Sequence, residues 1–217
     1  MKKYFLLFNL FWVVSTIVTY AQGVNVGVRG GLNVARVTGD IEERYFPWSS
    51  YSQKPRIGFN VGLDARSQLS AKVTLQAELV FSTEGAKASG QWTDSGEGKM
   101  KSTQKLGFLS LPLFVKYNFT PRFYVMGGPQ VSYLVSSKYE QESIGNGTVT
   151  TTNNLDAMNK FGFGIVPVLG YDFDKFSLGI RYYAGLSQLN KDDNLNRSLK
   201  SEVLSVVLRY TLFDVND

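Results

Sequence analysis

Six charged residues share one property, which is that each lies at the polar position of a stretch where apolar and polar residues alternate. They are Arg29, Asp64, Glu78, Lys116, Arg181 and Arg209. Cationic side chains gathered on one face can bind an anion, whereas carboxylates among them can neutralise them as ion pairs. Both interpretations stay open. The network of interior salt bridges is favoured over the anion site, because charges removed from water persist only when they are paired.

The chain contains no histidine and no cysteine. This excludes Ser-His hydrolase chemistry, a cysteine nucleophile, disulfides, and zinc sites built from these residues. We therefore expect a protein that is not an enzyme and that carries neither a cofactor nor a metal. The formal net charge of +5 is too small, and its charges too scattered, to predict a nucleic-acid partner.

Aromatic residues gather in one polar segment near the N-terminal third of the chain, at Tyr45, Phe46, Trp48 and Tyr51. Exposed rings on a loop can contact a protein or glycan partner. They are equally suited to the aromatic girdle at a membrane surface, and this second interpretation is favoured.

Period-two alternation dominates the chain beyond residue 22. It predicts strands, because successive side chains of a strand point to opposite faces. The expected strands cover residues 24–34, 57–66, 72–82, 105–119, 122–136, 160–172, 176–186 and 204–212. No convincing helical period accompanies them, so the fold class is all-β.

The connections between these strands alternate in length. Those near 67–71, 119–122 and 172–175 are short, whereas those near 38–55, 83–103, 137–159 and 188–200 are long and polar. Short and long connections that alternate along eight strands predict an antiparallel up-and-down barrel, with short turns at one end and long loops at the other.

The first residues are typical of a secretory signal peptide. Lys2 and Lys3 precede a largely apolar run, and Ala21 ends a segment with small residues at the cleavage positions. We expect a cleaved signal peptide over residues 1–21 and a single barrel domain over residues 22–217. Beyond this N-terminal run, no stretch is apolar enough for a spanning helix.

Alternation alone does not say which face of the barrel is outside. A soluble lipocalin-like barrel would turn the apolar set inward, and a transmembrane barrel would turn it outward. Two features favour the membrane: the polar face is rich in glycine, as a crowded interior requires, and aromatic residues cluster near the short turns.

Four segments carry a family resemblance. They are residues 27–33 (GVRGGLN), 109–117 (LSLPLFVKY), 123–129 (FYVMGGP) and 178–186 (LGIRYYAGL). Together they resemble the PorT-like outer-membrane β-barrel family of Bacteroidetes-type bacteria. The resemblance implies an outer-membrane protein of a Gram-negative cell. The founding member of that family is associated with type IX secretion, but no motif in this chain carries that role.

The expected function is that of a non-enzymatic structural or interaction protein, accessory to secretion or surface assembly. Its long loops would face outside and its short turns the periplasm. Outer-membrane lipid and other envelope proteins are the expected partners. A narrow porin-like channel for small solutes and a soluble lipocalin-like binding protein are the alternatives.

Overall fold

Nine β-strands make up most of the structure in residues 24–38, 50–92, 98–144, 149–153, 155–191 and 199–213, which are the residues that this computed structural model describes. The strands are β1 (Val24–Thr38), β2 (Ser50–Gln68), β3 (Val73–Trp92), β4 (Gly98–Asn118), β5 (Phe123–Ile144), β6 (Val149–Asn153), β7 (Phe161–Asp172), β8 (Phe176–Gly185) and β9 (Lys200–Phe213). A short 3-10 helix, η2 (Leu155–Ala157), lies between β6 and β7. No helix in these ranges is long and apolar enough to cross a membrane. The predicted signal peptide lies outside the described residues.

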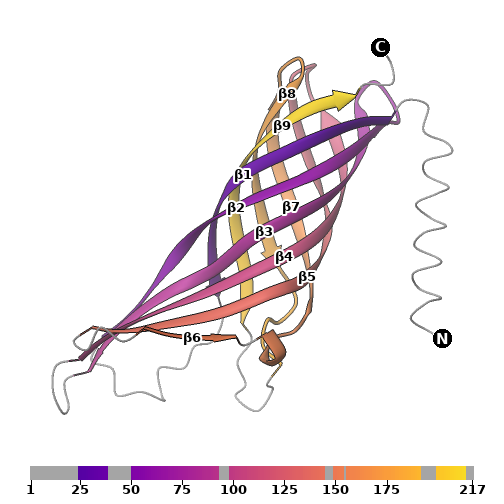
Figure 1. Cartoon of the computed structure of the whole chain (residues 1–217). Coiled ribbons are helices and arrows are strands. Elements are labelled where there is room, and N and C mark those ends of the chain that lie inside the picture. Colours follow the sequence, from indigo (N-terminus) through magenta and orange to yellow (C-terminus); the bar gives the residue numbers. More distant parts are fainter. Residues whose placement is uncertain are drawn as a thin grey trace, which may run out of the picture.

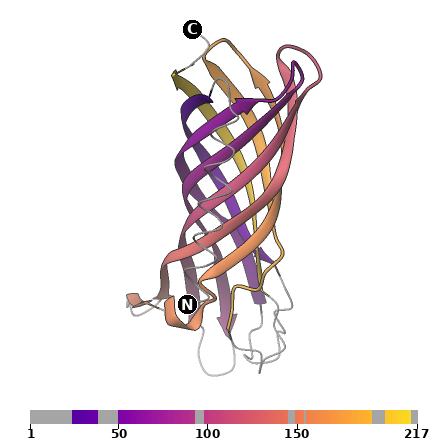
Figure 2. The same cartoon turned by 90° about the vertical axis from the view of Figure 1, so that its right-hand side faces the viewer.

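Eight of the described strands close into an antiparallel ring (Figures 1 and 2). The order around the ring is β1, β2, β3, β4, β5, β7, β8 and β9, and β9 returns to pair with β1. β6 lies outside the ring and pairs with the far part of β5, beyond the residues that pair with β7. Each ring strand thus neighbours the strands that precede and follow it, which confirms the predicted eight-stranded up-and-down barrel. Closure leaves the ring without the unpaired edges of an open sheet.

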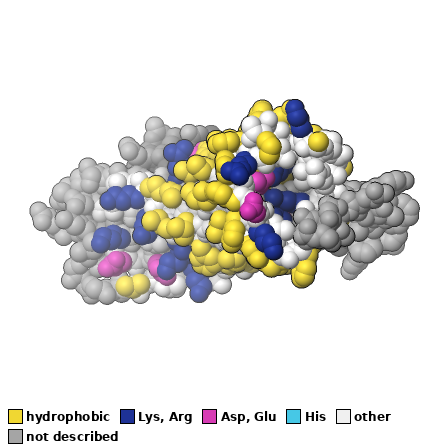
Figure 3. Space-filling view, turned by 90° about the horizontal axis from the view of Figure 1, so that it is seen from above, with side chains coloured by type: hydrophobic (Ala, Val, Ile, Leu, Met, Phe, Trp, Pro, Cys, Tyr) yellow, Lys and Arg dark blue, Asp and Glu magenta, His cyan; other side chains and the backbone are white. Residues whose placement is uncertain are grey.

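Alternate residues divide between the two faces of the barrel wall. On β8, Leu178 and Ile180 face outward and are 44% and 55% exposed, whereas the intervening Ser177, Gly179 and Arg181 are buried. The other ring strands follow the same rule, so hydrophobic side chains cover much of the outer surface (Figure 3). A soluble barrel would bury these side chains, so the lipocalin-like alternative is wrong. An apolar outer wall is what a bilayer interior requires.

Aromatic side chains border this apolar surface. At the short-turn end, neighbouring rings lie with centroids 4.8–5.1 Å apart in the pairs Tyr117–Phe119, Phe123–Tyr171 and Phe176–Tyr210. Nearer the other end, Tyr133 packs edge-on against Phe161 at 5.1 Å. Rings at both borders correspond to the two girdles that transmembrane barrels place at the membrane–water interfaces.

The three short connections are tight turns at one end of the barrel. A backbone hydrogen bond closes each of them: Leu69 N to Val73 O at 2.9 Å, Phe119 N to Phe123 O at 3.0 Å, and Phe173 N to Phe176 O at 2.7 Å. The predicted short turns near 67–71, 119–122 and 172–175 are therefore confirmed to within a few residues.

Three of the four predicted long connections are wrong in part, because strands β2 to β5 continue into them. β3, β4 and β5 contain 20, 21 and 22 residues, about twice the 9–11 residues that a tilted strand needs to cross a membrane. Residues 50–55, 86–92, 98–105 and 138–144 stay paired beyond the barrel and, with β6, form what we call the extended sheet (Figure 1). Both faces of this sheet are largely polar, so the apolar–polar alternation that revealed the other strands is missing there.

A change of backbone conformation marks the point where the extended sheet leaves the ring. Gly85 of β3 has a φ of +136°, a conformation that L side chains rarely adopt. The β2–β3 pairing shifts register between Pro55 and Asn60, directly beside it. A Cβ at Gly85 would also collide with the carbonyl oxygen of Gln104 on β4. Glycine is therefore needed where these strands bend away from the barrel.

Candidate functional site

The inward positions of neighbouring strands bring four of the predicted charged residues side by side. Arg29 on β1 is directly opposite Arg209 on β9, and Asp64 on β2 is directly opposite Glu78 on β3. Like charges in directly opposed positions are unfavourable by themselves. Because the basic pair lies next to the acidic pair around the ring, each arginine can reach a carboxylate.

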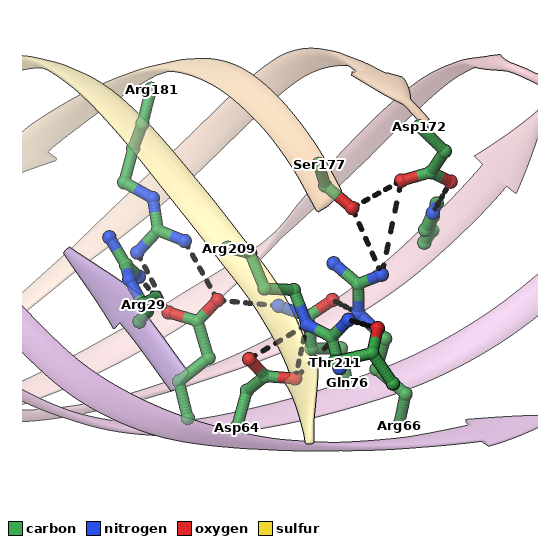
Figure 4. A network of polar contacts seen from close by, with 11 residues as sticks. Arg29, Asp64, Arg66, Gln76, Asp172, Ser177, Arg181, Arg209 and Thr211 are labelled. Atoms are coloured by element: carbon green, nitrogen blue, oxygen red, sulfur yellow. Dashed lines mark hydrogen bonds and ion pairs between the residues drawn. The ribbon is translucent and has the colours of Figure 1, made fainter. Parts of the chain in front are cut away.

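Glu78 is the centre of the first group of ion pairs. Figure 4 shows two of its partners, Arg29 and Arg181, on different strands of the ring. Arg181 of β8 reaches across the interior and donates to this carboxylate from both terminal guanidinium nitrogens, Nη1 to Oε2 and Nη2 to Oε1, each at 2.9 Å. Arg29 forms an ion pair with the same carboxylate through Nη1. Gln76 adds a hydrogen bond from Nε2 to Oε1 at 2.5 Å. One buried carboxylate therefore joins strands β1, β3 and β8.

Asp64 is the centre of the second group. Arg209 donates from Nε to both carboxylate oxygens, at 2.8 and 2.7 Å, and Arg66 Nε lies 3.7 Å from Oδ2. Gly27 on β1 provides the space for this arginine, because a Cβ there would lie 2.6 Å from Arg209 Nη2. This contact explains one of the glycines on the inward face.

Asp172, at the end of β7, is the centre of the third group, near the short-turn mouth. Lys116 of β4 forms an ion pair with Oδ2, and Ser177 donates to Oδ1 at 2.5 Å. Arg66 Nη1 lies 3.9 Å from Oδ1 and so links this group to Asp64. Lys116 Nζ also lies 3.9 Å from the centre of the Tyr124 ring, at a cation–π position.

A chain of hydrogen bonds continues from Arg29 along β1, β2 and β3 toward the long-loop end. Arg29 Nη2 donates to Asn60 at 2.9 Å, Asn60 donates to Asn33 at 2.6 Å, and Asn33 donates to Ser82 at 3.0 Å. Ser82 then donates to the buried carboxylate of Glu84 at 3.1 Å. From the other side, Ser201 of β9 also donates to Glu84, at 2.7 Å. One wall of the interior is therefore polar over most of its length.

Apolar side chains fill the rest of the interior. One cluster packs against the polar wall in the middle of the barrel and contains Ala35, Phe114, Tyr124, Met126, Val166, Val168, Tyr183 and Val203. A second cluster closes the long-loop end and combines strand residues with residues of the connections: Leu106, Phe108, Leu134 and Leu189, with Val37, Leu155, Met158 and Leu199 packed against them.

The space left between these side chains is small. One cavity of about 20 Å³ lies among the ion pairs, and another of about 10 Å³ lies beside Glu84. A single water molecule needs about 10–15 Å³. The interior described here is therefore a packed core with room only for a particle the size of a water molecule, as is general for an eight-stranded barrel.

The structure brings together all six predicted charged residues, and it adds partners that sequence reasoning missed. Four of the additions are buried at inward positions of the same alternation, where their burial could have been inferred: Asn33, Asn60, Gln76 and Glu84. Arg66 follows the same alternation, and its side chain is 11% exposed. Asp172 lies at a strand end, where alternation gives no clear face. Among the predicted loop residues, Tyr45, Phe46 and Trp48 lie outside the described residues. Tyr51 belongs to β2, but its side chain is not among those described.

Comparisons with curated proteins and solved structures show which known proteins this chain resembles. No curated protein matches it. Solved structures that resemble it include Ail, the attachment invasion locus protein of Yersinia pestis, at 13% identity and a TM-score of 0.48, with 87% of this chain and 99% of that chain covered. Neisserial surface protein A is similar at 12% identity and a TM-score of 0.43, with 86% and 97% covered. The outer membrane protease OmpT from Escherichia coli is similar at 9% identity and 0.41, with 88% and 96% covered. At these scores the likenesses carry no information on activity.

The decisive match is to a protein family. The model of the outer membrane protein beta-barrel domain matches residues 20–191, well over half of the 217 residues. This range includes most strands of the ring and the three carboxylates of the ion-pair groups. Together with the outward apolar wall, the match shows that the chain belongs to the outer membrane protein beta-barrel domain family.

Proposed function

We propose that this protein is a non-enzymatic outer-membrane protein with a structural or interaction role, in which the barrel anchors the extended sheet at the membrane surface. The observation that carries the proposal is the length of β3, β4 and β5, which continue as paired strands far beyond the apolar wall. Strands that served only to cross the membrane would end near its surface. The absence of histidine and cysteine from the sequence supports a role without catalysis.

The charge of the extended sheet supports an acidic partner surface. On its outward face, Lys54 is directly opposite Lys87, and Lys105 is directly opposite Lys138. Basic side chains gather on this part of the molecule, toward the left of Figure 3. Opposed like charges are unfavourable by themselves. Within the described part of the chain, Lys105 alone of these four lysines forms an ion pair, with Glu140 at 2.6 Å. A negatively charged partner surface would relieve this repulsion.

A shortened hairpin tests the interaction role. Because Ala88 is paired with Ser102, residues 89–101 can be replaced by Asn-Gly, a two-residue turn that suits a hairpin. We expect proteins cross-linked to the wild type in native outer membranes to be lost from this variant, while its barrel still shifts mobility on unheated gels. Recovery of the same partners with both proteins would contradict the role of the extended sheet.

The orientation and the signal peptide are part of the same proposal. We expect the mature chain to begin at Gln22 and to fractionate with outer membranes, with the extended sheet outside the cell. The natural chain lacks cysteine, so a single introduced cysteine is a unique label site. A membrane-impermeant maleimide should label Ser52→Cys in intact cells, and should label Ala71→Cys, in a short turn, only after lysis. The opposite pattern would reverse the orientation.

The channel alternative makes a different prediction. Because the ion pairs and the two apolar clusters fill the interior, we expect planar-bilayer recordings of the wild-type protein to show no stable conductance. Stable, ion-selective openings would favour the narrow porin-like channel over the packed anchor.

The finer family assignment is also part of this proposal. The matched family is the broad outer-membrane barrel family, and a PorT-like role as an accessory to secretion is a more specific proposal. It predicts that deletion of the gene lowers the amount of secreted protein at the cell surface. Normal secretion in the deletion strain would contradict the secretion role and would be compatible with the anchoring role.

A further inference from the structure

The ion-pair groups contain more positive charge than negative charge. Five cationic side chains, from Arg29, Arg66, Lys116, Arg181 and Arg209, accompany three carboxylates, from Asp64, Glu78 and Asp172. Within these three groups, two positive charges are therefore in excess in a largely desolvated space, which is unfavourable unless an anion compensates them. Glu84 lies outside the groups, farther along the interior, where its carboxylate accepts hydrogen bonds from Ser82 and Ser201.

Three of these arginines also have hydrogen-bond donors left over. Within the part of the chain that the structure describes, Arg29 Nε, Arg181 Nε and Arg209 Nη2 are buried and have no acceptor. The three side chains are only 5–6% exposed. A buried donor without an acceptor costs free energy in the same way as a lost hydrogen bond.

The same three arginines line the cavity of about 20 Å³. Asp64, Glu78 and Gly179 also line it, at the point where the first two ion-pair groups meet. Excess positive charge, unpaired N–H donors and a small cavity thus coincide at one place.

We propose that this cavity binds one small monoatomic anion of the halide class, for which chloride is the natural probe. A halide accepts several hydrogen bonds and donates none, so it suits a lining of surplus N–H groups. A water molecule of similar size would accept hydrogen bonds but would compensate no charge. Phosphate and carboxylate ligands need more space than the cavity contains. This inference goes beyond the anchoring role, which does not require a bound ion.

The test compares anions at constant ionic strength. The folded full-length barrel in detergent is unfolded in sodium chloride, in sodium bromide and in sodium gluconate, whose anion is too large for the cavity. We expect saturable stabilisation by chloride and bromide and none by gluconate. At a halide concentration ten times its dissociation constant, the folded state gains about elevenfold over the unfolded state. Equal stability in chloride and gluconate would overturn the proposal and leave a water molecule in the cavity.

A cavity-filling variant locates the effect. A Cβ on Gly179 would lie 3.4 Å from both Tyr124 Oη and Val168 Cγ1, which is ordinary contact, so Gly179→Ala adds a methyl group to the cavity without touching an ion pair. Gly162→Ala is the matched control, because its Cβ would also make ordinary contacts, 3.5 Å or more, beside the other cavity. We expect Gly179→Ala to lose the halide response and Gly162→Ala to keep it. A response retained in Gly179→Ala would overturn this site.

A second measurement does not depend on any variant. Crystals of the wild-type protein grown in bromide should show an anomalous peak within contact distance of the guanidinium groups of Arg29, Arg181 and Arg209. Bromide peaks confined to the outer surface would overturn the proposal. A negative result would leave the hairpin-shortening experiment unaffected, so failure of the anion site and failure of the anchoring role can be distinguished.

Discussion

Replacing Glu78 by alanine should lower the free energy of unfolding by about 3–5 kcal/mol, the usual cost of removing one partner from a buried ion pair. The carboxylate is 2% exposed and accepts two hydrogen bonds from Arg181 as well as an ion pair from Arg29. Its removal would leave two arginines without their main anion in a space with little water. The excess of positive charge in the interior would also increase.

Urea unfolding of the barrel in detergent, followed by the mobility shift between unheated and boiled samples, measures this loss. Glu142→Ala is the matched control, because Glu142 is exposed on the extended sheet and its loss should change stability by no more than about 0.5 kcal/mol. Adding Arg181→Met to Glu78→Ala should recover part of the loss, since the cost lies in the unpaired charge. Equal stability of Glu78→Ala and Glu142→Ala would show that Glu78 does not hold the interior together.

The second large effect is expected on the outer wall. There, Leu113→Arg should lower the free energy of unfolding by about 2–4 kcal/mol. Leu113 faces outward on β4 and is 47% exposed, between Leu109 on one side and Tyr117 of the aromatic border on the other. This places it near the middle of the apolar surface, where a bilayer offers a guanidinium group no water. The cost arises from transfer of the charge into hydrocarbon, because no contact inside the barrel is changed.

Val149→Arg provides the comparison at another depth. Val149 is also an exposed hydrophobic residue, at 62%, but it belongs to β6 of the extended sheet, outside the apolar wall. The same substitution there should lower the free energy of unfolding by no more than about 0.5 kcal/mol. Unfolding of both variants from lipid bilayers measures the difference. If both positions tolerate arginine equally, the apolar wall does not face hydrocarbon.

Periodicity made the barrel wall predictable, because one residue in two must face the lipid along every strand of the ring. The segment from Phe176 to Tyr182 reads directly as outward and inward positions, and the structure follows it residue by residue. The same rule predicted Arg29, Asp64, Glu78, Lys116, Arg181 and Arg209 as inward residues, and all six are buried. A shift of one residue would place these charges in lipid, so the register of the strands is strongly constrained.

The same rule failed where neither face of a strand meets lipid. The ends of β3, β4 and β5 have water on both sides, so their residues are polar on both faces and resemble a loop in sequence. Their pairing is decided by backbone hydrogen bonds to neighbouring strands, which any polar side chain permits. Alternation reports contact with an apolar environment, and strand formation does not require that contact.

Partner choice in the interior depended on the three-dimensional closure of the ring. Alternation shows that Glu78 and Arg181 point inward, but they are 103 residues apart, and only the tilt and stagger of closed strands bring β3 and β8 to the same depth. Asp172 became a partner of Lys116 for the same reason, although it lies at a strand end. The sequence by itself determined which residues are inside and which are outside, because that depends on local period. Only the tertiary structure decided which inside residues meet and where the cavity between them lies, because those depend on how the sheet closes.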